Sequence, residues 1–243
     1  MFSFKDKVVI VTGGSQGIGE CIARDFMKFD AKVIIIDKTT SDIPCHMFYE
    51  GDLTDIRVIE DFVKVVLEKF DSIDYLINNA CMGNGGILNS DYDDFIYTQK
   101  LCVAAPFMLA KLFASHFSLN GSIVNIASTR ALQSQTNTEC YTAAKGGILA
   151  LTHALAITLK DKIRVNCISP GWIDTTASKY SKEDHAQHPV GRIGVPKDIS
   201  NAVQFLCSDK SSFMTGENLI IDGGMSKLMI YHDDGGWQYD PKV

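Results

Sequence analysis

The feature that most constrains the fold of this chain is a glycine-rich turn with the sequence Thr-Gly-Gly-Ser-Gln-Gly-Ile-Gly at residues 12–19. It follows the apolar run Val8–Val11 and precedes the amphipathic segment Glu20–Phe29. A strand, a glycine turn and a helix in this order are typical of a nucleotide-binding unit, in which phosphates lie against unpaired N–H groups at the helix N-terminus. The turn therefore predicts a nucleotide cofactor.

The three spaced glycines of this turn have separate tasks. Gly13 allows the tight turn, Gly17 lets the backbone approach a pyrophosphate, and Gly19 lets the helix pack closely against the strand. The predicted cofactor contacts in this segment are Gly13, Ser15, Gln16, Gly17, Ile18 and Gly19.

Strand-like and helical segments alternate along nearly the whole chain. After the first strand, apolar runs occupy 33–36, 46–49, 75–77, 122–126, 163–168 and 219–221, and amphipathic segments occupy 56–70, 95–117, 141–159 and 197–206. Apolar strands that alternate with helices indicate a parallel sheet covered on both faces. We expect an α/β fold with a Rossmann-type, doubly wound parallel sheet, in which ligands bind beyond the carboxyl ends of the strands.

The composition limits the number of domains and the kind of partner. The chain has 243 residues, 46% of them hydrophobic, and no Pro- or Ser-rich linker divides it. We expect a single domain with a core at about 7–224 and a C-terminal extension at 225–243. The net charge of −6, without a basic block, argues against nucleic-acid binding, so a small molecule is the expected partner.

The sequence also carries information on compartment, thiols and metals. It shows no signal-peptide pattern and no apolar run of the ~18 residues that a membrane span needs, so a cytoplasmic protein without membrane contact is expected. Seven cysteines without a Cys-x-x-Cys pair favour reduced thiols over disulfides or a zinc site. His185 and His188 have no third ligand nearby and are interpreted as polar lid residues, so no metal is expected.

The ends of the second and third strands supply candidate contacts for the adenosine half of a cofactor. A carboxylate at Asp37 can accept hydrogen bonds from a ribose and repel a 2′-phosphate, which favours NAD and makes NADP the less favoured cofactor. A solvated aspartate is the alternative, and the neighbouring Lys38 can partly accommodate a phosphate. Asp52 and Leu53 are interpreted as an adenine contact, with a turn or helix cap as the alternative for Asp52.

The next two strand ends carry further candidates. Asn79 and Ala80 suit a backbone that passes close to a cofactor, and they suit a simple turn equally well. The fifth strand is followed by Ser128, and Tyr141 and Lys145 lie four residues apart on a predicted helix. This spacing places the ammonium beside the phenol on one helix face, where it favours the ionised phenol and makes it a usable general acid/base. A purely structural pair is the alternative.

These ordered motifs, taken together, resemble the short-chain dehydrogenase/reductase family from about residue 7 to 224. The resemblance implies that Ser128 holds the substrate oxygen and Tyr141 transfers the proton. It also implies that Lys145 binds the nicotinamide ribose and lowers the pKa of the tyrosine. The further cofactor contacts that it implies, besides Tyr141 and Lys145, are Pro170, Gly171, Ile173 and Thr175, around the nicotinamide carboxamide.

The resemblance implies an oxidoreductase that transfers a hydride between NAD(P) and a secondary alcohol or ketone. Gln16 supports NAD, since NADP-dependent relatives often place a cation there. Relatives are commonly tetramers, so a homo-oligomer, either tetramer or dimer, is expected. A cofactor-sensing binding protein on the same fold, with weakened catalysis, is the alternative function.

Two cysteines depart from the family's pattern. Cys81 replaces the glycine of an Asn-Asn-Ala-Gly motif, which puts a side chain near the nicotinamide side of the cleft. Counting back from Phe107 places Cys102 where the family carries a catalytic asparagine. A thiol is a poor substitute for an amide in hydrogen bonding, so Cys102 keeps the binding-protein alternative open.

The C-terminal extension is unusually apolar for a tail. It contains Leu228, Met229, Ile230, Tyr231, Trp237 and Tyr239. Such side chains are unfavourable in water, so we expect an ordered tail packed over a cleft, against a partner subunit or on the surface of its own subunit.

Overall fold

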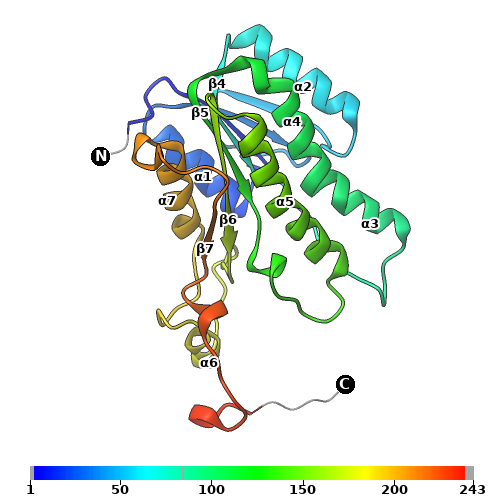
Figure 1. The fold of residues 1–243 in the computed structure, drawn as a ribbon, viewed down its shortest axis with the longest axis vertical. Coiled ribbons are helices and arrows are strands. Elements are labelled where there is room, and N and C mark those ends of the chain that lie inside the picture. The colour runs from blue at the N-terminus through cyan, green and yellow to red at the C-terminus, as the bar shows by residue number, and fades with distance from the viewer. Residues whose placement is uncertain (1–2, 84, 239–243) are drawn as a thin grey trace.

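Seven parallel strands form one sheet in the order β3-β2-β1-β4-β5-β6-β7 (Figure 1). The strands are β1 (Val8–Thr12), β2 (Lys32–Asp37), β3 (Met47–Glu50), β4 (Ile73–Asn78), β5 (Phe117–Ile126), β6 (Ile163–Pro170) and β7 (Asn218–Ile221). The strand order reverses between β1 and β4, and a crevice for ligands arises beyond the carboxyl ends of strands at such a point. This computed structural model describes residues 3–83 and 85–238.

Helices cover both faces of the sheet. The helices of the described chain are α1 (Gly17–Met27), α2 (Ile56–Lys69), α3 (Tyr92–Gln99), α4 (Ala105–Phe113), α5 (Glu139–Thr158), α6 (Lys182–Ala186) and α7 (Pro196–Cys207), of which α6 lies beyond the end of the sheet (Figure 1). Helices α2, α4 and α5 contribute side chains to one buried core, and α1 and α7 contribute to the other (Figure 1). The doubly wound α/β fold expected from the sequence is confirmed.

Strand β1 shows why the apolar runs are continuous. Val8 and Ile10 belong to the core that α2 and α4 cover. Val9 and Val11 belong to the core that α1 and α7 cover. Because successive side chains of a strand point to opposite faces, a strand buried on both faces is apolar at every position.

The helix expected at 95–117 is not continuous, so this prediction is wrong in detail. Helix α3 ends at Gln99, a π-helical turn spans Lys100–Ala104, α4 ends at Phe113, and residue 117 already begins β5. The Ala105 N–H bonds to the Lys100 carbonyl five residues back, and Pro106 has no N–H to donate. The proline therefore removes one α-helical hydrogen bond at the point where the π-helical turn ends.

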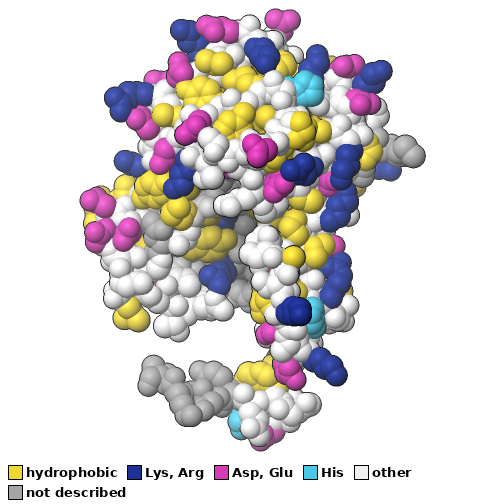
Figure 2. Space-filling model, turned by 180° about the vertical axis from the view of Figure 1, so that it is seen from behind, with side chains coloured by type: hydrophobic (Ala, Val, Ile, Leu, Met, Phe, Trp, Pro, Cys, Tyr) yellow, Lys and Arg dark blue, Asp and Glu magenta, His cyan; other side chains and the backbone are white. Residues whose placement is uncertain are grey.

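The C-terminal tail does not occupy one of the positions expected for it, the surface of its own subunit. After a single turn at Met225–Lys227, residues 228–238 run away from the sheet past α6, and they form a separate group of side chains below the body of the protein (Figures 1 and 2). The exposed apolar side chains are Leu228, Met229, Ile230, Tyr231 and Trp237. Tyr239 lies outside the described residues. The described tail is thus not packed on the surface of its own subunit.

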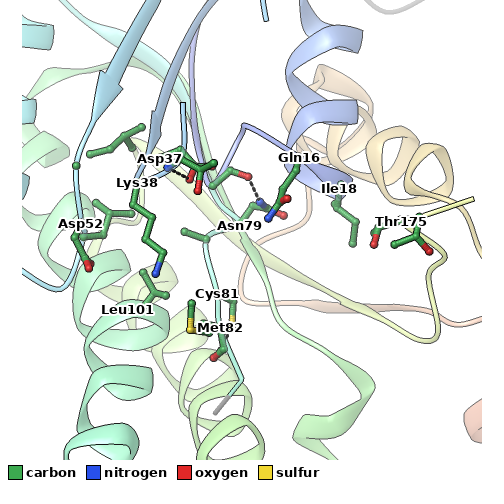
Figure 3. A pocket seen from close by; sticks show the side chains of 18 residues that line it. Gln16, Ile18, Asp37, Lys38, Asp52, Asn79, Cys81, Met82, Leu101 and Thr175 are labelled. Atoms are coloured by element: carbon green, nitrogen blue, oxygen red, sulfur yellow. Dashed lines mark hydrogen bonds between the residues drawn. The ribbon is translucent and has the colours of Figure 1, made fainter. Parts of the chain in front are cut away.

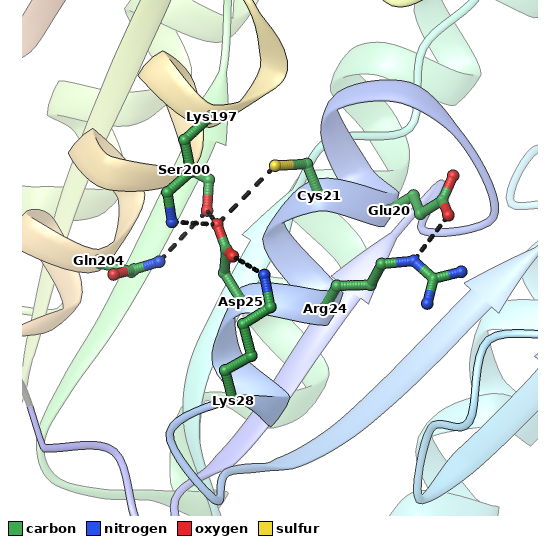
Figure 4. A network of polar contacts seen from close by, with 8 residues as sticks. All are labelled: Glu20, Cys21, Arg24, Asp25, Lys28, Lys197, Ser200 and Gln204. Carbon is green, nitrogen blue, oxygen red and sulfur yellow. Dashed lines mark hydrogen bonds and ion pairs between the residues drawn. The ribbon is translucent and has the colours of Figure 1, made fainter.

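A buried carboxylate joins the two helices on one face of the sheet (Figure 4). Asp25 of α1 is 2% exposed, and it accepts hydrogen bonds from Lys197 at 2.7 Å and Ser200 at 2.6 Å, both in α7. Lys28 donates a third bond at 3.0 Å. Burial acts to raise the pKa of Asp25, but the bonds from Lys197, Ser200 and Lys28 outweigh it and hold the pKa below its ordinary value.

We predict that Asp25→Asn lowers the free energy of unfolding at pH 7 by about 1–3 kcal/mol, because the charged acceptor is lost. Because the pKa of Asp25 is lowered in the folded protein, its carboxylate contributes fully to the free energy of unfolding when the pH is above the ordinary pKa of 3.8. This contribution is lost as the pH falls through the lowered pKa. The difference between the two proteins in urea unfolding should therefore shrink in acid.

The exposed pair of Glu20 and Arg24, 2.8 Å apart on the same helix, supplies the matched control. Glu20→Gln should change the free energy of unfolding by less than about 0.5 kcal/mol. A loss in Asp25→Asn that stays constant between pH 7 and pH 3 would show that side-chain packing, and not charge, is responsible.

Candidate active site

A cavity of about 430 Å³ lies beyond the carboxyl ends of β1, β2 and β4, a size that suits a small ligand (Figure 3). The predicted cofactor contacts in its wall are Gly13, Gln16, Gly17, Ile18, Asp37, Asp52, Leu53, Asn79, Ala80 and Thr175. The predicted contacts that do not line it are Ser15, Gly19, Tyr141, Lys145, Pro170, Gly171 and Ile173. The structure therefore brings most of the expected adenosine and phosphate contacts together around one cavity.

The glycine turn fits tightly against its neighbours. Gly13 has a φ of +63°, which favours glycine, and a Cβ there would lie 2.8 Å from the Cα of Ala80. A Cβ on Gly19 would overlap the carbonyl oxygen of Gly13. Both glycines are therefore required by the close approach of α1, β1 and the segment after β4.

A hydrogen-bonded clamp connects the end of β1 to the segment after β4. The Thr12 hydroxyl accepts the backbone N–H groups of Asn79 and Ala80, each at 3.0 Å. The side-chain amide of Asn79 donates to the carbonyls of Thr12 and Gly13 at 3.0 and 2.9 Å. The amide of Asn79 thus holds the glycine turn, in addition to lining the cavity.

Asp37 faces the glycine turn from the end of β2. One carboxylate oxygen accepts the N–H of Ser15 at 3.0 Å, and the other accepts the N–H of Thr39 at 3.0 Å. These two bonds fix the carboxylate in the wall of the cavity. Asp37 is therefore not a freely solvated strand-end residue.

Lys38 is hydrogen-bonded to a tyrosine that is not part of the glycine turn. Its ammonium donates to the hydroxyl of Tyr97 at 3.2 Å, and this hydroxyl donates to Asp52 at 3.0 Å. Asp52 also accepts the N–H of Thr54 at 2.9 Å, so it caps a turn as well as lining the cavity. Figure 3 shows Lys38 and Asp52 on one side of the cavity and Thr175 on the opposite side.

Several residues that line the cavity were not predicted from the sequence. These are Ile36, Thr39, Gly51, Met82, Leu101 and Thr176. Thr39 and Gly51 lie just beyond strand ends, so a wider window after each strand would have included them. No local sequence pattern predicts that Leu101 lines the cavity, because only the packing of the π-helical turn brings it there.

The three candidate catalytic residues come from two neighbouring elements. Ser128 follows β5 and accepts the N–H of Arg130 at 3.1 Å, which starts a short turn that α5 contacts. Tyr141 and Lys145 lie on α5, with the Lys145 ammonium 5.3 Å from the centre of the tyrosine ring. The Arg130 guanidinium carbon lies 5.8 Å from the same ring centre. The turn that begins at Ser128 therefore lies beside Tyr141.

Lys145 is a buried cation at the centre of this arrangement. Its side chain is 3% exposed, and its ammonium donates to the Ile126 carbonyl at the end of β5 at 2.7 Å. Burial disfavours the charge, but Cys81 and Tyr141 act in the opposite direction and raise the pKa of Lys145 above its ordinary value. The lysine is thus held in its charged form next to both groups.

The two histidines each have a hydrogen-bonding partner in the backbone. His188 is 2% exposed, with its Nδ1 3.2 Å from the Asp184 carbonyl, so its interpretation as a polar lid residue is wrong. His185 accepts the N–H of Ile193 at 3.3 Å. Within residues 3–83 and 85–238, no three His, Cys, Asp or Glu side chains are arranged to hold a metal ion.

The chain is similar to known proteins in sequence and in fold. The family model described as enoyl-(acyl carrier protein) reductase matches residues 13–226. The chain belongs to the short-chain dehydrogenase/reductase family. It is 38% identical to an uncharacterized oxidoreductase of Thermotoga maritima, over 93% of this chain and 98% of that one. It is 33% identical to the L-fucose dehydrogenase of Mus musculus, over 91% of this chain and 89% of that one.

A solved structure agrees with this assignment. An apo SCOR enzyme from Clostridium thermocellum has a TM-score of 0.89 to this chain and is 44% identical in sequence, with 97% of this chain and 99% of that one covered. Membership in the short-chain dehydrogenase/reductase family makes the chain an oxidoreductase that uses a nicotinamide cofactor and a small-molecule substrate. In the described part of the chain, no helix has the length and apolar character needed to span a membrane.

We predict that Thr12→Val weakens the clamp at the glycine turn. Valine keeps the size of the buried side chain but leaves the N–H groups of Asn79 and Ala80 without their acceptor, at a loss of about 1–3 kcal/mol in the free energy of unfolding. Thr12→Ser keeps the hydroxyl and should lose less. Urea unfolding of the three proteins measures the difference, and a larger loss in Thr12→Ser than in Thr12→Val would assign the effect to the methyl group.

Proposed function

We propose that the chain is an NAD-dependent oxidoreductase that interconverts a secondary alcohol and a ketone. The position of Asp37 is the observation that favours NAD over NADP. Its carboxylate is fixed in the cavity wall by two backbone N–H groups, where it can accept hydrogen bonds from a ribose and repel a 2′-phosphate.

The residues around the cavity fit a dinucleotide along its length. Asp37, Asp52 and Leu53 suit the adenosine end, and the glycine turn at the start of α1 suits the pyrophosphate. Lys38, the nearest cation to Asp37 in sequence, is held by the hydroxyl of Tyr97, which is itself bonded to Asp52, and this supports NAD over NADP. Across the cavity, Thr175 lies against Gly17, whose added Cβ would be 3.3 Å from the threonine methyl.

We assign the nicotinamide end to residues just after β4 and at or just after the end of β6. The proposed contacts there are Asn79, Ala80, Pro170, Gly171, Ile173 and Thr175. Gly171 is fixed by a bond from its N–H to the Ile221 carbonyl at 3.0 Å, and Ile173 pairs with Gly194 in an isolated parallel bridge. These contacts tie the segment after β6 to β7 and to the link before α7.

The proposed proton transfer uses the groups beside α5. NAD(H), when bound, accepts or supplies the hydride. Ser128 orients the substrate oxygen, Tyr141 gives or takes its proton as general acid/base, and the ammonium of Lys145 favours the phenolate that forms and holds the nicotinamide ribose. The buried position of Lys145, 5.3 Å from the tyrosine ring centre, supports this electrostatic role.

We expect the substrate to be a small molecule with an oxidisable hydroxyl group, in agreement with the named activity of the mouse relative, an L-fucose dehydrogenase. We also expect a homo-oligomer, a tetramer or dimer, in which partner subunits cover the tail. The exposure of Met229 and Tyr231, at 76% and 64%, supports a surface of this kind.

We predict that wild-type protein binds NADH more tightly than NADPH, and that Asp37→Asn reduces this preference by about tenfold or more, because it removes the charge at the ribose. Fluorescence titration with both reduced cofactors measures the two dissociation constants. Asp71→Asn removes one exposed surface charge and serves as the control. Equal or tighter binding of NADPH by the wild-type protein would contradict the proposal and would indicate that Lys38 accommodates the 2′-phosphate.

We predict that Tyr141→Phe lowers turnover on the order of 10²-fold or more, since the variant has no phenolic proton to transfer. Cofactor affinity and thermal stability should change little, because one hydroxyl is lost. Tyr92→Phe, at a tyrosine 76% exposed on α3, is the matched control. Near-normal turnover of Tyr141→Phe would overturn the assigned mechanism, whereas cofactor binding without turnover of any hydroxy or keto compound by the wild-type protein would favour a cofactor-sensing role.

A further inference from the structure

Two cysteines far apart in sequence meet beside the cavity. Cys81 follows β4, and Cys102 lies 21 residues later in the π-helical turn. Their sulfur atoms are 2.6 Å apart, only about half an ångström beyond the ~2.05 Å of a disulfide bond. Both are free thiols in this structure. Their side chains therefore already point at each other from two separate segments of the chain.

The two thiols differ in access. Cys81 is half-buried and lines the cavity, where Figure 3 shows it beside Met82. Cys102 is 4% exposed and lies behind it. A small reagent that enters the cavity therefore meets Cys81 first, and Cys102 is in position to react with whatever forms on Cys81.

The two thiols also differ in charge. A hydrogen bond from Cys102 lowers the pKa of Cys81, burial opposes this, and the nearby charge of Lys145 lowers it further, so the net pKa lies below its ordinary value. The hydrogen bond to Cys81 and burial both raise the pKa of Cys102. Since the thiolate is the reactive form of cysteine, Cys81 is the expected nucleophile and Cys102 the resolving thiol.

We propose that Cys81 and Cys102 are a redox-modification site, which forms a reversible disulfide when a peroxide enters the cavity. The sulfur of Cys81 attacks one peroxide oxygen, the O–O bond breaks, and a sulfenic acid and one water form. The sulfur of Cys102 then attacks the sulfur of Cys81, the S–O bond breaks and a second water leaves with the thiol proton. In total, two thiols are oxidised and one hydrogen peroxide is reduced to two waters.

Disulfide formation changes the surroundings of the buried cation. The reduced pair presents a sulfur that can carry negative charge close to Lys145, and the disulfide cannot carry this charge. The bond also ties the segment after β4 to the π-helical turn between α3 and α4. Both segments contribute to the cavity wall, through Met82 and Leu101. Oxidation and reduction therefore alter the same site that binds the ligand.

The test is treatment of the full-length protein with hydrogen peroxide, followed by alkylation and peptide mapping by mass spectrometry. We expect a linked peptide pair that contains Cys81 and Cys102, a loss of two hydrogens from the intact mass, and full reversal by dithiothreitol. We expect Cys81 to react at least about tenfold faster than Cys45, which is also half-buried but whose pKa is raised by burial.

Three variants separate the two roles. Cys102→Ser should stop at the sulfenic acid, which a cyclic diketone such as dimedone labels at Cys81. Cys81→Ser should form neither the sulfenic acid nor the disulfide, and Cys45→Ser should behave as the wild-type protein. Absence of the Cys81–Cys102 link in oxidised wild-type protein, or dimedone labelling of Cys102→Ser at other cysteines with none at Cys81, would overturn the proposal. This readout needs no substrate and no cofactor, so it stands apart from the tests of the proposed function.

Discussion

The contact between two strand ends is the constraint on which the whole site depends. β1 and β4 are paired in the sheet as far as Val11 and Ile77, and beyond this point the chain leaves them toward opposite edges, so a further link between the two segments is needed to hold them together. The hydroxyl of Thr12 and the amide of Asn79 supply that link with four hydrogen bonds. The clamp places the glycine turn, the start of α1 and the segment after β4 at fixed distances, and the cavity exists between them.

A second centre of organisation is the buried ammonium of Lys145. It is held by the Ile126 carbonyl, lies near the ring of Tyr141, and is close enough to Cys81 for each group to shift the pKa of the other. Electrostatic interactions are stronger in a site shielded from water. One cation therefore connects the proposed proton transfer with the proposed thiol chemistry. This connection explains why a change in the charge of Cys81 bears on the site as a whole.

The sequence predicted the fold and many of the residues that line the cavity, since both depend on short patterns. Continuous apolar strands and the glycine turn identify the doubly wound sheet, and residues after strand ends gather at one edge by geometry alone. Predictions from the sequence were poorer where the packing of neighbouring elements decides the local structure. The helix at 95–117 is interrupted by a π-helical turn, and His188 is buried where a lid residue was expected. Both outcomes depend on packing that no local pattern encodes.

By itself, the sequence determined the alternation of strands and helices, the glycine turn, and the spacing of Tyr141 and Lys145 on one helix face. Each is local, because hydrophobic periodicity and backbone freedom act over a few residues. Only the tertiary structure decided that the carboxylate of Asp37 faces the glycine turn, that Lys38 is held by Tyr97, and that Cys81 meets Cys102. The two cysteines were visible in the sequence as separate departures from the family's pattern. Their contact arises because the π-helical turn packs against α5 and shares one core with Ala80 and Cys81, and this placement is set by the core and not by either segment alone.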